Sequence, residues 1–291
     1  MNLTHRRAVW LMVAVTLMWS IAGVVTRQLE AARSFEVTFW RSFFTALSLL
    51  LILPLWRTPR GLWRTLRLAP AGLWWSALCW SGMFTFFMLA MTMTSVGRVL
   101  IVSALGPLFT ALLARMFLRQ SVRRHTWIAI VVAAAGMAWM FGGQALQGEL
   151  AGTLVACLVP LSAACNWVVV QHAHTRGDDV DLMPSVAIGA TISAMVTLPL
   201  AWPLQATGHD IQLLALLGVV QLALPCTLLV LCARVLQAPQ IALLGQMEVL
   251  FGIALAWLGA GEVPATTVLQ GGTVVLAALL INEYLGWRSR P

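Results

Sequence analysis

The stretch IALLGQMEVLFGIALAWL (241–258) is apolar apart from two polar residues, Gln246 and Glu248. A run of about 18 residues is long enough for an α-helix to cross the hydrocarbon core of a membrane. Glu248 lies near the centre of this run, where an unpaired carboxylate costs about 2.5–3.5 kcal/mol on insertion scales. A glutamate at this position therefore needs a partner or a function that offsets the cost.

The composition of the chain extends this interpretation to all 291 residues. Hydrophobic residues make up 60% of the chain and charged residues 10%, whereas a soluble domain has about 25% charged residues. So few charges cannot cover a water-facing surface, which predicts a polytopic membrane protein. The five cysteines lie within apolar runs and lack metal-ligand spacing, so we expect no disulfide, metal or cofactor.

Ten apolar runs are long enough to cross a membrane, and each is expected to be a helix because backbone polar groups in lipid must bond within their own segment. The expected spans are 8–25, 35–53, 71–92, 99–117, 126–142, 152–170, 183–201, 211–231, 239–258 and 266–285. The expected fold class is therefore all-α, with ten transmembrane helices.

The arginines are distributed unequally between the two sides of this arrangement. The net charge of +8 comes from 18 basic residues, all of them arginine. Fourteen fall on the side that holds both termini, whereas Arg27, Arg33 and Arg98 fall on the other side and Arg41 lies within a span. Such an excess predicts that both termini are cytoplasmic, and it indicates topology rather than binding to nucleic acid.

The two halves of the chain, 1–145 and 146–291, align weakly when the sequence is shifted by 142 residues. This shift places Phe109 on Phe251 and Gly106 on Glu248. Because each half holds five expected spans, an odd number, the second half must run inverted across the membrane. Two inverted five-helix repeats within one compact domain are typical of transporters rather than of channels or membrane enzymes.

Three segments resemble a known family: LMWSIAGVVTR (17–27), TFWRSFFTAL (38–47) and SVGRVLIVSALGPLFTALLA (95–114). They are similar to the EamA branch of the drug/metabolite transporter superfamily, over nearly the whole chain. The resemblance implies a central cavity that opens to one side of the membrane at a time, and export of small metabolites, often amino acids, from bacteria. The layout is similar to that of aromatic amino-acid exporters. The chain departs from the family pattern at Arg119-Gln120, at Glu248-Val249 and at Asn166-Trp167.

Two charged residues within spans are the first candidates for a site. Glu248 can bind a substrate ammonium group, carry a coupling proton or bond to the end of a broken helix, and all three remain open. Arg41 can form a structural or gating ion pair with Glu36, extend toward the membrane surface, or bind a substrate carboxylate.

The remaining candidates are aromatic, polar or helix-breaking residues expected to border the cavity. Trp80, Met83, Phe84 and Phe87 are spaced three and four residues apart and share one helix face, which suits flat apolar substrates but is also ordinary packing. The expected cavity residues are Trp19, Ser20, Trp80, Met83, Phe84, Phe87, Ser103, Pro107, Asn166, Trp167, Gln246 and Glu248.

The sequence thus predicts a transporter of the bacterial inner membrane that is not an enzyme and exports amino acids, with aromatic and other apolar ones favoured. A monomer is expected, although small-residue faces leave association open. The first alternative is a proton-coupled exporter of drugs or quaternary cations. Such an exporter uses one membrane glutamate to bind both the proton and the substrate cation. A remote alternative is a membrane prenyltransferase, because DDVD (178–181) resembles a magnesium-binding motif, but a second acidic motif is missing.

Overall fold

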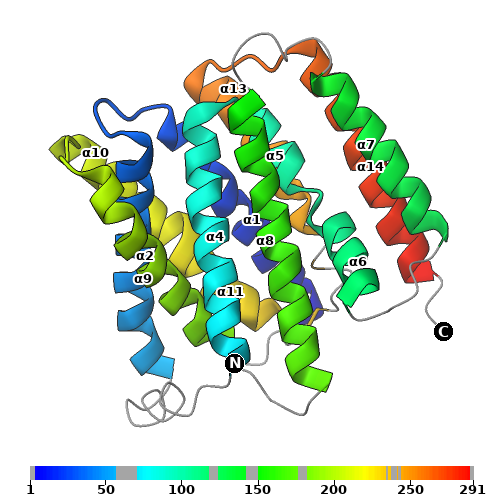
Figure 1. Ribbon diagram of the computed structural model, residues 1–291, viewed down its shortest axis with the longest axis horizontal. Coiled ribbons are helices and arrows are strands. Elements are labelled where there is room, and N and C mark those ends of the chain that lie inside the picture. The colour runs from blue at the N-terminus through cyan, green and yellow to red at the C-terminus, as the bar shows by residue number, and fades with distance from the viewer. Residues whose placement is uncertain are drawn as a thin grey trace.

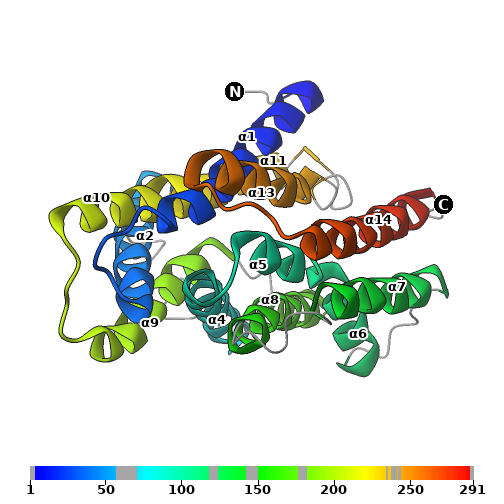
Figure 2. The same cartoon turned by 90° about the horizontal axis from the view of Figure 1, so that it is seen from above.

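A computed structural model describes residues 4–56, 71–117, 124–141, 150–175, 182–233, 235–236, 241 and 244–288, and all regular structure in these ranges is helical. Figures 1 and 2 show the helices as a bundle. The elements are α1 (His5–Thr26), α2 (Ser34–Trp56), α4 (Ala71–Met93), α5 (Val96–Ser103), α6 (Gly106–Phe117), α7 (Arg124–Phe141), α8 (Leu150–Thr175), α9 (Leu182–Ala201), α10 (Gly208–Leu216), the π-helix η1 (Leu217–Ala223), α11 (Leu224–Ala233), α13 (Met247–Ala260) and α14 (Thr266–Arg288).

Eight segments of the described chain are helical, long enough and apolar enough to cross a membrane. The fifth expected span corresponds to α7, with 18 residues, and the described apolar helix of the ninth span is α13, with 14 residues. The chain is therefore an all-helical polytopic membrane protein, as the sequence predicts, while the count of ten spans stays a prediction.

The fourth and ninth spans are interrupted at equivalent positions. The fourth span divides at Ala104 and Leu105, between α5 and α6. In the ninth span, a turn at Gln246 precedes α13. A shift of 142 residues carries Ala104 onto Gln246. Both α6 and α13 consequently begin inside their spans rather than at a membrane surface, which is the discontinuous-helix geometry that transporters use near a binding site.

Buried hydroxyl groups join α2, α4 and α9. The Ser193 hydroxyl of α9 lies 3.0 Å from the Ser42 hydroxyl of α2 and 2.9 Å from the Thr85 hydroxyl of α4. In lipid a hydroxyl has no water to bond, so polar contacts of this kind hold helices together by about 0.6–2 kcal/mol each. Apolar packing and hydrogen bonds between hydroxyl groups therefore both hold these three helices together.

Helices α7 and α14 lie side by side at one edge of the bundle in both views. Their backbones approach closely because both surfaces carry small residues: a Cβ atom added at Gly136 would lie 3.0 Å from the carbonyl oxygen of Gly271. A hydrogen bond of 3.2 Å from Trp139 Nε1 to Gln270 Oε1 adds a polar contact. The small residues of the fifth and tenth spans thus serve packing within one chain.

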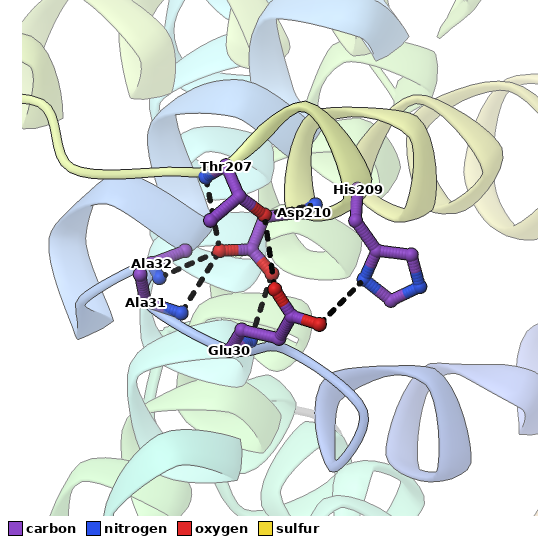
Figure 3. Close-up of polar contacts among 6 residues, drawn as sticks. All are labelled: Glu30, Ala31, Ala32, Thr207, His209 and Asp210. Carbon is purple, nitrogen blue, oxygen red and sulfur yellow. Dashed lines mark hydrogen bonds and ion pairs between the residues drawn. The ribbon is translucent and has the colours of Figure 1, made fainter.

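The loops before α2 and before α10 are joined through Asp210, a wholly buried residue (Figure 3). Its carboxylate accepts hydrogen bonds from the backbone N–H groups of Glu30 at 2.8 Å and of Ala31 and Ala32 at 3.0 Å. Thr207 and Asp210 also form a capping box at the start of α10. Because several aligned N–H donors satisfy the carboxylate, the contact holds the first and eighth spans together at this end.

Candidate functional site

The candidate site centres on Arg41, which lies in α2 and is 2% exposed. Its Nε donates a hydrogen bond of 3.1 Å to Gln221 Oε1, while its Nη1 is buried without a hydrogen-bond partner. The Cζ atom lies 5.6 Å from the ring centroid of Phe87 and 6.0 Å from that of Phe84. Arg41 is thus a buried cation in aromatic surroundings whose donors are incompletely used, and such a group attracts an anion.

Glu248 supplies the opposite charge. It is half-buried in the first turn of α13 and interacts electrostatically with Arg41. No ion pair within 4.0 Å joins the two side chains, and Glu248 has no hydrogen-bond partner among the residues that the structure describes. The N-terminal end of a helix carries a partial positive charge, so α13 itself stabilises the carboxylate. Together with Arg41, this helix end offsets the cost of placing Glu248 inside an apolar run.

Arg41 and Glu36, which could form an ion pair judging from the sequence, are not paired in the structure. Glu36 is wholly buried and accepts hydrogen bonds from the backbone N–H groups of Gln205, at 2.9 and 3.0 Å, and Ala206, at 2.8 Å. Residues five apart on an α-helix point about 140° away from each other. Glu36 therefore serves the loop before α10, and Arg41 faces Gln221.

The structure brings aromatic residues of α4 together beside Arg41. Trp80 and Phe84 have ring centroids 5.5 Å apart, and Phe84 and Phe87 are both buried beside Arg41. The indole Nε1 of Trp80 is buried without a hydrogen-bond partner. Met83 lies half-buried on the same helix. Trp80, Phe84 and Phe87 thus form an aromatic surface next to the Arg41 cation. The Trp80 Nε1–H group on this surface has no hydrogen-bond acceptor.

The two predicted residues of α1 take part differently. The Ser20 hydroxyl is buried and donates to the carbonyl of Leu17 in its own helix, at 2.7 Å. Trp19 takes part through its backbone, because its carbonyl oxygen accepts a hydrogen bond of 3.2 Å from Gln221 Nε2. The main chain of α1 therefore reaches the site, whereas the Ser20 hydroxyl already has a partner.

Asn166 and Trp167 of α8 do not join the Arg41 group. Asn166 is buried, and its Oδ1 accepts a 2.6 Å hydrogen bond from the Ser76 hydroxyl, whose oxygen also lies 3.0 Å from the Ser185 hydroxyl. This amide therefore links α8 to α4 and α9. Trp167 is 58% exposed, because adjacent residues on a helix point about 100° apart. Trp167 therefore faces the outside of the described structure.

Ser103 and Pro107 flank the interruption of the fourth span. Ser103 ends α5, and its hydroxyl oxygen is buried without a hydrogen-bond partner. Pro107 is the second residue of α6, where a missing N–H costs nothing because the first turn of a helix has no internal acceptor for it. The Gly106-Pro107 pair therefore permits α6 to begin within the membrane.

Four predicted site residues each have a buried polar side-chain atom without a hydrogen-bond partner. Within the described chain, Arg41 Nη1, Trp80 Nε1, Ser103 Oγ and Gln246 Oε1 are all buried without a hydrogen-bond partner. Each such atom costs about 1–3 kcal/mol in a folded protein. Donors and acceptors left in this condition are available to a polar ligand.

Gln221 is a site residue that is not among those predicted. It lies 2% exposed within η1, between Arg41 and the Trp19 carbonyl. The available signal is an isolated amide within a long apolar span. Two stretches singled out in the sequence, DDVD (178–181) and Arg119-Gln120, lie outside the described residues.

Comparison with known proteins places these features in a family. The model of the EamA-like transporter family matches residues 6–142 and again residues 150–284. A solved crystal structure, 16% identical in sequence, superposes with a TM-score of 0.65 and covers 98% of this chain and 99% of its own. That likeness concerns the fold alone. Among curated proteins, none matches the sequence.

Proposed function

Because the chain belongs to the EamA-like transporter family and is a membrane transporter of small solutes, we propose that it exports amino acids, aromatic and other apolar ones preferentially. The proposed site of action is the bacterial inner membrane, with both termini in the cytoplasm. The family consists of transporters, so a prenyltransferase activity is not proposed. Alternating access between two inverted repeats is the proposed mechanism.

One observation carries the substrate class: the buried guanidinium of Arg41 has an unpartnered Nη1, and Glu248, a residue of opposite charge within its electrostatic range, forms no direct ion pair with it. An α-amino acid has a carboxylate and an ammonium group separated by one carbon atom. Its carboxylate would bind Arg41 and its ammonium group Glu248. An aromatic or aliphatic side chain would contact Phe84 and Phe87, whose rings border the guanidinium.

The same pair weighs against the alternative of a cation exporter. Such a protein also needs a membrane carboxylate, which Glu248 provides, but it gains nothing from a buried arginine nearby. Two like charges repel by roughly 4 kcal/mol at about 4 Å and an effective dielectric constant of about 20, and by less at greater separation. Arg41 therefore disfavours a monovalent cation at Glu248 and favours a zwitterion.

Transport requires that this closed site open alternately to each side. Arg41 is 2% exposed, so a substrate would reach it only in another conformation. Helix α13 begins within its span and carries Glu248 in its first turn. A rotation or displacement of α13 would therefore move Glu248 relative to Arg41, and the distance between the two charges would depend on the state of the transporter.

The experiment is counterflow in proteoliposomes that contain the purified chain, without a pH gradient. The vesicles are preloaded with phenylalanine, and labelled phenylalanine is supplied outside. Phenethylamine, which lacks the carboxylate, and 3-phenylpropionate, which lacks the ammonium group, serve as competitors. We expect saturable uptake and much weaker competition by both analogues than by leucine. Glu248→Gln and Arg41→Lys should each weaken phenylalanine uptake at least tenfold, whereas Gln212→Glu on the exposed face of α10 should not.

Two results would contradict the proposal. Uptake of organic cations that requires a pH gradient, with no amino-acid counterflow, would establish the cation exporter. Equal competition by phenylalanine and phenethylamine would show that the substrate carboxylate is not recognised, and Arg41 would then have a structural role.

A further inference from the structure

Gln221 occupies an unusual backbone segment. The eighth span begins as α10, continues as the π-helix η1 over Leu217–Ala223, and ends as α11. A π-helical turn is less favourable than an α-helical one and is frequently found at functional positions. Gln221 lies inside this segment and is 2% exposed. An amide buried in an apolar span is costly unless both of its ends have partners.

Both ends of the Gln221 amide are in use. The oxygen accepts from Arg41 Nε at 3.1 Å, and the nitrogen donates to the carbonyl oxygen of Trp19 at 3.2 Å. One partner is a donor and the other an acceptor, so the amide has a single orientation that satisfies both. Gln221 thereby joins the guanidinium of α2 to the main chain of α1.

The close approach of η1 to α2 depends on Gly218. A Cβ atom added at Gly218 would lie 2.8 Å from the carbonyl oxygen of Arg41 and 2.9 Å from the backbone nitrogen of Thr45. The Thr45 hydroxyl donates to the Gly218 carbonyl at 3.2 Å. The π-helix therefore rests directly on the backbone that carries Arg41, which brings the Gln221 side chain to the guanidinium.

The bond to Nε determines which part of the guanidinium remains available. A guanidinium presents two edges to a carboxylate, one that includes Nε and one formed by Nη1 and Nη2. Gln221 Oε1 accepts the hydrogen bond from Arg41 Nε, so the edge that includes Nε is already in use. The other edge includes Nη1, which is buried without a hydrogen-bond partner. A bidentate carboxylate would therefore bind through the Nη1–Nη2 edge.

We propose that Gln221 is a positioning residue for substrate recognition: it holds Arg41 so that the Nη1–Nη2 edge meets the substrate carboxylate, and it ties that edge to α1. The inference rests on the proposed function, in which the substrate is an amino acid. It adds that discrimination between an amino acid and the corresponding amine depends on a residue that does not itself touch the substrate.

The test measures two ligands in two variants of the full-length chain in proteoliposomes. Gln221→Met removes both hydrogen bonds at similar volume, and Gln221→Glu offers Arg41 a competing carboxylate. Gln212→Met and Gln212→Glu are matched controls at an exposed position of α10. For each variant, the half-saturating concentration of phenylalanine and the inhibition constant of phenethylamine are determined by counterflow, together with the maximal rate.

We expect Gln221→Met to raise the half-saturating phenylalanine concentration about tenfold or more, in line with a misplaced hydrogen bond to a charged group. The phenethylamine inhibition constant should stay within about twofold of the parent value. Gln221→Glu should weaken phenylalanine binding to a similar extent. It should strengthen phenethylamine binding, because the site gains a negative charge. The maximal rate should change less than the half-saturating concentration.

The proposal is overturned if the affinities for phenylalanine and phenethylamine fall by the same factor, because a structural defect would have that effect. It is also overturned if neither changes. Where Gln221→Met does not fold, Gln221→Glu decides alone, because it keeps the length and the acceptor atom: unchanged phenylalanine affinity overturns the proposal. Failure of the parent protein to exchange any amino acid would instead overturn the proposed function, before either variant is compared.

Discussion

Arg27 Nε lies 2.8 Å from Glu262 Oε2, and this pair joins segments 235 residues apart in the chain. The same guanidinium donates to the carbonyl oxygens of Met91, at 3.0 Å, and Thr94, at 2.7 Å. Glu262 in turn accepts from the backbone N–H of Val96 at 2.7 Å. We call these five residues the Arg27 latch, and it connects the ends of α1 and α4 to the start of α5 and the loop after α13.

The Arg27 latch borders two surface cavities, of about 180 and 420 Å³, and Glu262 and Ser95 line both. The side chains of Arg27 and Glu262 are 29% and 22% exposed, so water can replace their bonds at modest cost. The Asp210 carboxylate at the same end is wholly buried on backbone donors. Of these two contacts, the latch is therefore the one that we expect to break more easily.

Arg27→Gln is expected to loosen this end. A cysteine introduced at Ser95, in a chain whose native cysteines are replaced, would report the change through its rate of reaction with a membrane-impermeant maleimide. We expect that rate to rise at least threefold in Arg27→Gln, because one ion pair and two bonds to carbonyl oxygens are lost. Glu30→Gln, an exposed change in the adjacent loop, is the control. An unchanged labelling rate would show that the latch does not hold this end closed.

Exchange of the two latch charges is expected to fail as a rescue. In Arg27→Glu/Glu262→Arg the ion pair can form again, but a carboxylate at position 27 cannot donate to the Met91 and Thr94 carbonyls. An arginine at position 262 likewise cannot accept from Val96. Labelling at Ser95→Cys should therefore remain as fast as in Arg27→Gln. A return to the parent rate would show that the charge pair alone matters.

Asp210→Asn is expected to lower the stability of the protein markedly. The amide keeps one oxygen and places an N–H₂ group at the position of the other, so it faces either the backbone N–H of Glu30 or those of Ala31 and Ala32 (Figure 3). Donor then faces donor in a buried position, at a cost of about 2–4 kcal/mol. Thermal unfolding in detergent measures the loss. Glu30→Gln should change little, because the contact of Glu30 with His209, at 3.8 Å, is an exposed one.

Gly218→Ala is expected to impair both stability and affinity. The added methyl group would lie 2.6 Å from Phe44 Cβ and 2.8 Å from the Arg41 carbonyl oxygen. Backbone atoms cannot move aside locally, so η1 must shift away from α2, at about 1–3 kcal/mol. Both the phenylalanine affinity measured by counterflow and the melting temperature measured in detergent should decrease. The control is Gly208→Ala in the same span, where nothing lies within 4 Å of an added Cβ; equal effects of both changes would contradict the prediction.

The double variant Arg41→Met/Glu248→Gln is expected to separate stability from transport. Replacing buried charges by neutral groups of similar size is often neutral or stabilising. The substrate-free double variant should therefore lose no more than about 1–3 kcal/mol of stability in thermal unfolding, the cost of leaving the buried Gln221 Oε1 without its Arg41 donor, while phenylalanine counterflow is lost. Arg41→Met alone should be less stable than the double variant, because it leaves Glu248 without its cation. A larger loss of stability in the double variant would assign both charges to the structure.

Individual site residues show where inference from sequence succeeds and where it fails. Glu248 and Arg41 are recognisable because a charge inside an apolar span is costly wherever the span lies. The relation of Arg41 to Glu36 is not recognisable, because residues five positions apart are near each other in the sequence but point to different sides of α2. Asn166 is polar and central like Glu248, yet it bonds to Ser76 between helices. A polar residue within a span is thus recognisable as a candidate, but the sequence does not show whether it bonds to another helix or binds substrate.

The sequence by itself determines that this chain is a bundle of membrane-spanning helices, because hydrophobic length and scarcity of charge leave no other structure for its backbone in lipid. It also indicates an interruption at Gly106-Pro107, since this is a local property of those residues, whereas a broken helix near Glu248 is only one of its alternatives. Only the tertiary structure decides that Gln221 meets Arg41 across 180 residues and that Glu262 meets Arg27. Such contacts depend on which faces of distant helices pack together, and in a span that is apolar all around, the sequence pattern contains little information about facing.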